Sequence, residues 1–187
     1  MAITPKHSDT SDDLRSDRGV DYTRLRDFLK SENWAAADLE TASLLIVHLA
    51  RQAARGYLDE EDMKKIPSTD LQTIDKLWLK YSKGHFGFSI QRKIWYTTDK
   101  NIKKFAEKVL WRNRPWFFTL NNQTTPNIFF TKFWFFSLSY TLDAPLGQLP
   151  AVVWQKRLSN NRNPFQVAAI LDTYVSSLFS RQDVFKG

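Results

Sequence analysis

Few side chains in this sequence could carry out acid–base or metal chemistry. The three histidines, His7, His48 and His85, have no companion at metal-ligand spacing. The chain has no cysteine, which excludes disulfides, thiolate nucleophiles and zinc–thiolate sites. It contains no nucleotide-binding glycine motif and no Ser–His–Asp pattern. The acidic run 59–62 is better explained as the start of a helix than as a site for a divalent ion, because carboxylates are favoured at the positive end of the helix dipole. The sequence therefore names no catalytic residue.

The aromatic side chains suit a different task, the binding of a flat apolar ligand. Aromatic residues make up 14% of the chain, with 14 Phe and 7 Trp, although the mean hydropathy is only −0.45. Two aromatic clusters, Trp116–Phe118 and Ile128–Phe136, flank the polar stretch 121–127 and could form an aromatic hairpin or a long loop. A monomer does not tolerate so many exposed rings on one surface. Some of them must therefore pack in the core, while others can line a ligand or a partner.

The charge of the chain leaves the nature of an anionic partner open. A net charge of +7 and a pI near 9.6 are compatible with nucleic acid, an anionic membrane surface or a small carboxylate ligand. A nucleic-acid module would stack bases on aromatic rings and hold phosphates with neighbouring cations. Here the aromatic clusters are contiguous, and Arg112, Arg114 and Lys132 are the only cations near them. A flat apolar ligand is therefore the main hypothesis, and a single-stranded nucleic-acid-binding module is the alternative.

Hydrophobic periodicity predicts a mainly α, compact, multi-helix fold. Apolar residues recur at helical spacing in segments bounded by capping residues, glycine or proline. The expected helices cover about 21–31, 34–54, 59–66, 68–83, 88–96, 101–110 and 163–178. No stretch reaches the roughly 18 apolar residues that a membrane-spanning helix needs. Residues 1–19 are rich in Asp and poor in apolar side chains, which predicts a disordered tail that folding does not need. Residues 20–187 are then one domain.

The most specific pattern lies over residues 70–95. Ser68 or Thr69 could cap a helix at its start, and Gly84 could end that helix in the left-handed conformation. A second helix follows the tripeptide Phe86-Gly87-Phe88, whose glycine lets the backbone or a ligand approach closely. The apolar residues of the first helix recur at helical spacing, namely Leu71, Ile74, Trp78 and Tyr81.

The same residues resemble the signature of a known protein family. Residues 70–95 follow the pattern DLxTIDxLWxKYSxGxFGFSxQxxIW of the genomes-uncoupled-four family, whose members bind porphyrins and stimulate magnesium chelatase in chlorophyll synthesis. The resemblance extends upstream over residues 21–62. Downstream, Ala144–Pro150 resembles the family's APxGHLP turn, with Gln148 in place of the usual His. Together these segments cover roughly residues 20–155, which is a whole domain.

The resemblance implies a cup-shaped, non-enzymatic domain with a tetrapyrrole as its ligand. Protoporphyrin IX or its magnesium complex is the expected ligand, and a bilin or a signalling role unrelated to the chelatase is the alternative. The expected partner is the large subunit of magnesium chelatase, in the cytoplasm of a cyanobacterium or in the plastid stroma, with a peripheral contact to the thylakoid membrane. The aromatic insertion 116–136 is longer than the family norm and is expected to cover the cup or to touch a membrane surface.

The expected ligand site combines an apolar wall with cations for the propionates. Leu138 and Tyr140 occupy places where the family usually has a Phe and a Trp, so the wall stays apolar but is thinner. Lys156 and Arg157 are the cations nearest to the 147–150 turn, behind which the family has two arginines. The full set of tetrapyrrole-binding residues that the resemblance implies is Met63, Ile66, Phe86, Phe88, Trp134, Phe136, Leu138, Tyr140, Leu149, Trp154, Lys156 and Arg157.

Alternation along a strand would place Trp134 and Phe136 on one face of the aromatic insertion and Phe133 on the other. Trp134→Ala is expected to weaken porphyrin binding with little change in melting temperature, because its ring faces the ligand. Phe133→Ala is expected to destabilise the fold by about 3 kcal/mol, because its ring packs in the core. Fluorescence titrations and thermal melts of both variants test this assignment, and the opposite pattern would contradict it.

Overall fold

The computed structural model describes residues 12–52, 54, 58–111, 138–151 and 164–185. These residues form helices and no strand, which confirms the mainly α fold. Within these ranges, no helix combines the length and the hydropathy required to cross a membrane. In chain order the helices are α1 (Thr23–Lys30), α2 (Trp34–Ser43), the π-helix η1 (Leu44–Leu49), α3 (Glu60–Lys65), α4 (Ser68–Tyr81), α5 (Phe88–Thr97), α6 (Ile102–Lys108) and α8 (Pro164–Phe179).

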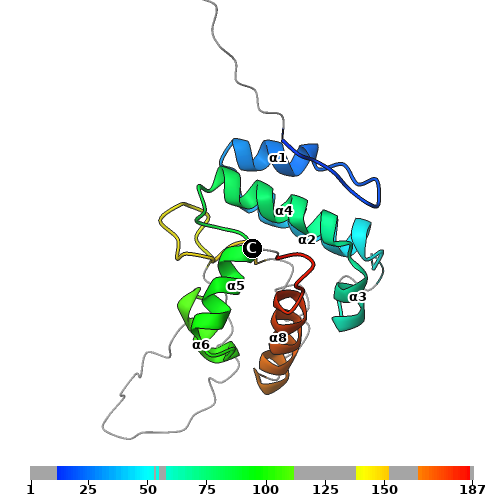
Figure 1. Cartoon of the computed structure of the whole chain (residues 1–187). Coiled ribbons are helices and arrows are strands. Elements are labelled where there is room, and N and C mark those ends of the chain that lie inside the picture. The colour runs from blue at the N-terminus through cyan, green and yellow to red at the C-terminus, as the bar shows by residue number, and fades with distance from the viewer. Residues whose placement is uncertain (1–11, 53, 55–57, 112–137, 152–163, 186–187) are drawn as a thin grey trace, which may run out of the picture.

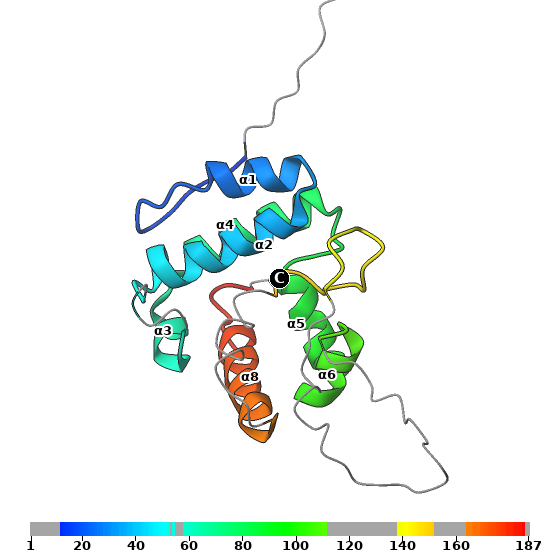
Figure 2. The ribbon, with the colours of Figure 1, turned by 180° about the vertical axis from the view of Figure 1, so that it is seen from behind.

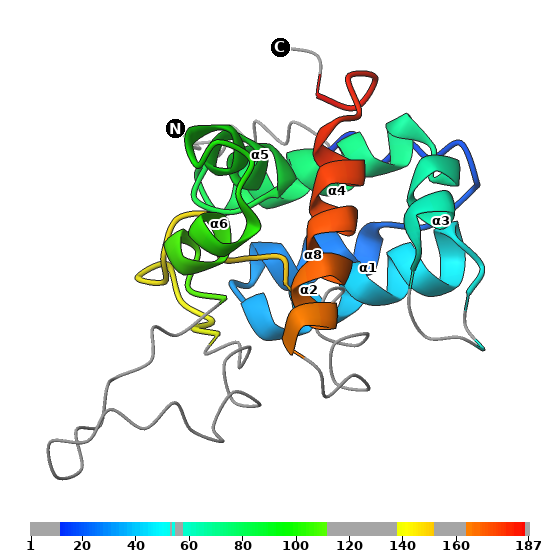
Figure 3. The ribbon, with the colours of Figure 1, turned by 90° about the horizontal axis from the view of Figure 1, so that it is seen from below.

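The helices are arranged in two layers. Helices α1, α2 and α4 form one layer, in which α1 packs on both α2 and α4 (Figure 1). Helices α3, α8, α5 and α6 lie on the other side of α2 and α4, as the view from behind also shows (Figure 2). Seen from below, α8 crosses under α4 and α2, with α3 on one side and α5 and α6 on the other (Figure 3). Helix α8 contacts α3, α5 and α6 and therefore ties the second layer together. A hollow cup between the layers stays a prediction.

The core of the molecule is organised around Trp78 of α4. The Trp78 ring stacks on Trp34 of α2 with 6.1 Å between ring centroids, and Phe86 lies edge-on to both rings at 6.1 and 5.6 Å. The indole N–H of Trp78 donates a hydrogen bond of 3.0 Å to the hydroxyl of Thr41, so its buried polar atom is satisfied. This aromatic cluster joins α2, α4 and the turn that leads into α5.

Helix α4 begins at Ser68 as expected, but its cap and its end differ from the sequence-based expectation. Pro67 is the N-cap residue in an extended conformation, and neither Ser68 nor Thr69 caps the helix with its side chain. The expected cap is therefore wrong, because the fixed φ of proline already sets the helix entry. Gly84 does adopt the left-handed conformation, with φ of +78°, but the regular helix ends three residues earlier, at Tyr81.

The second expected helix ends earlier than its apolar pattern suggests. Helix α2 stops at Ser43 and continues as the π-helix η1, in which the N–H of Ala50 donates to the carbonyl of Leu45. Arg51 follows with φ of +56°, which ends the helical run before the expected end at Ala54. A π-turn inserts an extra residue without changing the apolar character of the sequence, so periodicity cannot reveal it.

The segment that precedes α1 is packed on the domain, in contrast to the tail expected over residues 1–19. The buried carboxylate of Asp70 accepts hydrogen bonds from the hydroxyl of Ser16 and from the backbone N–H of Asp17 at 3.1 Å, as well as from Tyr22 at 2.6 Å. Thr73 of α4 donates to the carbonyl of Arg15 at 2.7 Å. The expectation of a detached tail is therefore wrong for residues 12–19, and residues 1–11 lie outside the described part.

Polar contacts replace the missing apolar side chains in this N-terminal segment. Asp12 accepts hydrogen bonds from Lys80 and Tyr81 at the far end of α4. The guanidinium of Arg18 donates to the carbonyls of Leu49 and Lys65 at 2.8 and 2.9 Å. The segment thus runs along α4 and contacts η1 and the end of α3. The composition of the segment does not predict this packing, because hydrogen bonds to buried acceptors do not require apolar residues in the sequence.

Removal of residues 1–19 is expected to lower the free energy of unfolding by about 2 to 4 kcal/mol, because it removes hydrogen bonds to the buried Asp70 carboxylate. A chain that begins at Asp12 is the control and keeps every contact described above. Urea unfolding of both chains measures the difference. Equal stability of the two chains would show that the N-terminal segment contributes nothing to folding.

Candidate functional site

The loop 138–151 carries Leu138, Tyr140 and Leu149, and in the chain it joins two segments that carry five more of the twelve expected ligand residues. It lies against the turn before α5 through backbone hydrogen bonds. The N–H of Gly147 donates to the carbonyl of His85 at 3.0 Å, and the N–H of Gly87 donates to the carbonyl of Leu149 at 3.1 Å. The ring Nε2 of His85 donates in turn to the carbonyl of Ala144 at 2.7 Å. The loop is therefore docked on this turn along its second half.

Two glycines allow this close approach. Gly147 has φ of +73°, and a Cβ atom there would lie 2.8 Å from Cδ1 of Ile94. Gly87 has φ of +129°, and a Cβ atom there would lie 2.9 Å from the Asp75 carboxylate. Both positions thus need a residue without a side chain. The sequence-based interpretation of Gly87 as a point of close approach is confirmed for the backbone, since it bonds to Leu149.

A buried carboxylate occupies the N-terminus of α5. The side chain of Asp75 accepts a hydrogen bond from the N–H of Ser89 at 2.9 Å and another from the Ser89 hydroxyl. Burial raises the pKa of Asp75, while the bonds from Ser89 act in the opposite direction. The positive end of the helix is thus already matched by a group of the protein itself.

The side-chain amide of Gln91 on α5 binds the backbone of the docked loop. Gln91 is fully buried on α5, and its Nε2 donates to the carbonyls of Gly147 and Pro150 at 3.0 and 2.9 Å. Those two donations account for both N–H groups of the side chain. Because buried carbonyls are costly to leave without a donor, these two bonds stabilise the docked conformation of the loop.

Gln148 links the two ends of the segment that lies between Trp111 and Leu138. Its backbone carbonyl accepts a hydrogen bond of 2.8 Å from the indole N–H of Trp111. Its side-chain oxygen accepts a bond of 2.8 Å from the N–H of Ser139. The residue that replaces the usual His of the resembled turn is fully buried and binds both Trp111 and Ser139, which flank the part of the chain that contains the aromatic insertion.

The beginning of the next segment is held by α2. The N–H of Ala151 donates a hydrogen bond of 2.8 Å to the carboxylate of Asp38, which is fully buried. Tyr140 lies near this carboxylate and is 36% exposed. Burial, followed by the charge of Asp38, raises the pKa of Tyr140 to about 12. At neutral pH the exposed phenol is therefore uncharged and can both donate and accept a hydrogen bond.

The structure places the expected ligand residues in different environments. Phe86, Phe88 and Leu149 meet at the docked loop but are fully buried in the core. Leu138 is partly buried beside the core, and Tyr140 is the exposed one among the described members of the set. Their role as ligand contacts stays a prediction. The remaining members near the loop lie outside the described residues, namely Trp134, Phe136, Trp154, Lys156 and Arg157.

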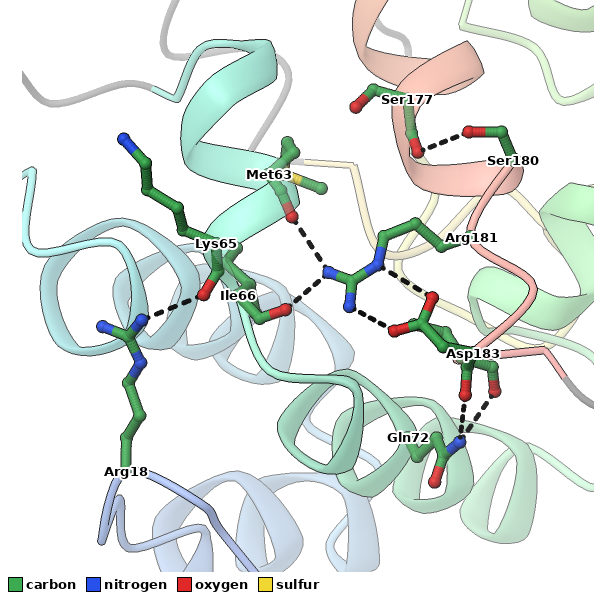
Figure 4. Close-up of polar contacts among 10 residues, drawn as sticks. Arg18, Met63, Lys65, Ile66, Gln72, Ser177, Ser180, Arg181 and Asp183 are labelled. Atoms are coloured by element: carbon green, nitrogen blue, oxygen red, sulfur yellow. Dashed lines mark hydrogen bonds and ion pairs between the residues drawn. The ribbon is translucent and has the colours of Figure 1, made fainter.

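Met63 and Ile66 lie at the end of α3, next to the C-terminal end of α8. Both side chains are fully buried. Their backbone carbonyls accept hydrogen bonds from the guanidinium of Arg181, which also pairs with Asp183 at 2.6 Å (Figure 4). Arg18 binds the neighbouring carbonyl of Lys65 from the other side (Figure 4). Both side chains therefore lie in the core and not on an exposed surface.

Sequence reasoning missed the polar residues that position this site. Asp38 and Gln91 each stand among apolar residues on a helix, and this pattern is a usable signal for a buried polar group with a structural task. The roles of Trp111 and Arg181 leave no comparable signal, because their bonds go to backbone carbonyls distant in sequence. Among the described residues, no group of three or more His, Cys, Asp and Glu side chains is placed to hold a metal ion.

Comparison with known proteins assigns these features to a family. A family model described as GUN4-like matches residues 15–164, which include the 70–95 pattern and the docked loop. A relative from Arabidopsis thaliana, named tetrapyrrole-binding protein, chloroplastic, is 45% identical over 89 residues, 46% of this chain and 33% of that protein. The Ycf53-like protein of Synechocystis sp. is 34% identical over 139 residues, 73% of this chain and 53% of that protein.

The fold is similar to that of a solved structure as well. The structure of GUN4 from Chlamydomonas reinhardtii matches with a TM-score of 0.65 and 28% identity, over 92% of this chain and 95% of that chain. The chain spans about half or less of the length of the two curated relatives described above, so they contain further regions that this chain does not match.

Replacement of Gln91 by Met is expected to lower the free energy of unfolding by about 2 to 4 kcal/mol, because it leaves two buried carbonyls without their donor. Gln72→Met is the matched control. Gln72 also donates to two carbonyls, those of Asp183 and Val184, but it is half-exposed and water can replace it. Urea unfolding measures the free energy of unfolding of both variants. Equal decreases would show that the Gln91 bonds stabilise the fold no more than the half-exposed Gln72 bonds do.

Proposed function

Since the chain belongs to the GUN4-like family, we propose that it binds a tetrapyrrole and does not transform it chemically. The observation that supports this function best is the family match over residues 15–164, which runs through the core and the docked loop alike. The name of the Arabidopsis relative, a tetrapyrrole-binding protein, indicates the class of ligand. Protoporphyrin IX or magnesium protoporphyrin IX is the ligand that we propose.

The energetics of such a complex are adequate for micromolar binding. Burial of roughly 400 Å² of macrocycle at about 25 cal/mol per Å² gives on the order of 10 kcal/mol before the entropy of association is subtracted. The exposed phenol of Tyr140 and the partly buried Leu138 offer contact area at the start of the docked loop. The uncharged state of the phenol favours this role, because a phenolate would lose hydration on contact with an apolar ring.

Lys156 and Arg157 are proposed to pair with the propionates of the ligand. They follow the anchor at Ala151 in the chain and belong to a basic stretch that continues to Arg162. Pairing at the rim of a site orients a ligand more than it adds affinity, because water competes for both charges. The buried residues Met63, Ile66, Phe86, Phe88 and Leu149 are proposed to support the site from the core.

The biological role proposed here is regulation of magnesium chelatase in chlorophyll synthesis, through contact with its large subunit. The relatives from a chloroplast and a cyanobacterium support the plastid stroma or the cyanobacterial cytoplasm as the compartment. A peripheral contact with the thylakoid membrane is part of the same proposal. A bilin is the alternative ligand, because the segment after Pro150 departs from the family pattern and has Ser159 where the second arginine is expected.

Titration with protoporphyrin IX tests the proposed function. Quenching of tryptophan fluorescence is expected to saturate with a dissociation constant of about 0.1 to 10 μM. The absence of quenching at tens of micromolar, with a folded protein, would contradict the proposal. Parallel titrations with magnesium protoporphyrin IX, a bilin and single-stranded DNA identify the class of ligand, and binding of DNA alone would favour the nucleic-acid alternative.

The double variant Lys156→Ala/Arg157→Ala is expected to weaken protoporphyrin binding by about 1 to 2 kcal/mol and to lower its salt dependence. The control is Lys30→Ala/Lys65→Ala, which removes the same charge from exposed positions on α1 and α3. An unchanged affinity and salt dependence in the first variant, measured by the same quenching titration, would place the cations for the propionates elsewhere.

A further inference from the structure

The net positive charge of this protein comes from the second half of its sequence. Residues 1–91 contain 13 Lys or Arg and 15 Asp or Glu, whereas residues 92–187 contain 14 Lys or Arg and only 5 Asp or Glu. The first half is therefore slightly acidic and the second strongly basic. Such asymmetry indicates a surface that meets an anionic partner, since a uniform excess of charge would be enough for solubility alone.

The described part of this basic half has its exposed lysines on α5, α6 and the turn between them. We define the α5–α6 corner by five exposed lysines, Lys93, Lys100, Lys103, Lys104 and Lys108. Helix α6 turns only Phe105 and Ala106 fully into the core. The corner also exposes two large apolar side chains, Tyr96 and Leu110, which are each 44% exposed. In Figures 1 and 3 it lies at the edge of the molecule opposite α3.

Part of the corner is held in a defined conformation. The guanidinium of Arg92 and the ammonium of Lys100 lie over the Tyr96 ring, at 5.0 and 5.2 Å from its centroid. Asp99, Lys100 and Leu110 all have φ near +50°, a conformation that costs on the order of 1 kcal/mol per non-glycine residue. A surface whose side chains are already ordered loses less entropy when a partner binds.

The carboxylates within the corner decide which anionic partner fits it. Asp99 pairs with Lys104 at 3.2 Å, and its side chain is 83% exposed in the middle of the lysines. A phosphate backbone or an anionic bilayer offers only negative charge to this carboxylate, whereas a protein segment can place a cation or a neutral donor opposite it. The exposed cations of the corner are lysines, whereas recognition of nucleic acid favours the forked guanidinium of arginine. A protein surface can match a mixed pattern of charges around apolar anchors.

We propose that the α5–α6 corner is the docking surface for an acidic segment of a partner protein. Carboxylates of that segment pair with Lys103, Lys108 and their neighbours, and one or two of its apolar side chains pack on Tyr96 and Leu110. The proposal does not rest on tetrapyrrole binding, since none of the residues that it uses belongs to the expected ligand set or holds the docked loop.

The test uses the full chain and a fluorescein-labelled 16-residue peptide in which glutamates surround leucines at helical spacing. Fluorescence anisotropy is expected to show that Lys103→Glu/Lys108→Glu weakens peptide binding by about tenfold or more. The control is Lys30→Glu/Lys65→Glu, which changes the net charge equally on α1 and α3 and is expected to weaken binding by less than about twofold. Leu110→Asn removes an apolar contact, while asparagine still tolerates the left-handed backbone at this position. This variant is expected to weaken binding at high salt as well, because salt does not screen an apolar contact.

Each outcome bears on the proposal. Equal losses in the two charge-reversal variants would overturn it, because they would indicate an unspecific effect of net charge. Binding of phosphatidylglycerol vesicles or oligothymidine to the corner, with no binding of the peptide, would overturn it in favour of lipid or nucleic acid. Protoporphyrin quenching is expected to be unchanged in all these variants, so failure of the docking surface and failure of ligand binding are distinguishable.

Discussion

The edge-on packing of Phe86 against Trp34 and Trp78 is the constraint on which the other features of this structure depend. It holds the turn between α4 and α5 against the first layer of helices. The same turn then presents the backbone of His85 and Gly87 to the loop 138–151. If this aromatic contact were lost, the loop would have no fixed surface to dock on. Three buried rings are thus a condition for the position of a loop more than fifty residues away in sequence.

Buried polar groups then determine how the loop is held. Apolar packing is non-directional, whereas hydrogen bonds between buried groups allow few geometries. Gln91 and Asp38 bind the backbone of the loop and of Ala151, and Gln148 gathers the residues on both sides of the aromatic insertion. The result is a scaffold from which both segments with the expected ligand residues start. Functional groups are commonly carried by loops that a rigid framework positions in this way.

The two ends of the described chain serve the same framework. Arg18, from the N-terminal segment, and Arg181, after α8, bind carbonyls at the end of the short helix α3. A helix of six residues has little stability of its own, because most of its terminal carbonyls lack a partner within the helix. The two guanidiniums supply these partners. Helix α3 is therefore stabilised by residues that lie at opposite ends of the sequence.

The sequence by itself determined the helical class, the boundaries of α5 and α6 within one or two residues, the cap of α3 at Asp59 and the family, because periodicity, capping residues and a contiguous motif are local signals. Tertiary structure alone decided the π-turn after α2, the packing of residues 12–19 on α4 and the burial of Met63, Ile66 and Phe88, which were expected at a ligand surface. The reason is physical. Hydrogen bonds between distant backbone groups, and the choice between an apolar side chain in the core and one at a binding surface, depend on neighbours that only the folded chain brings together.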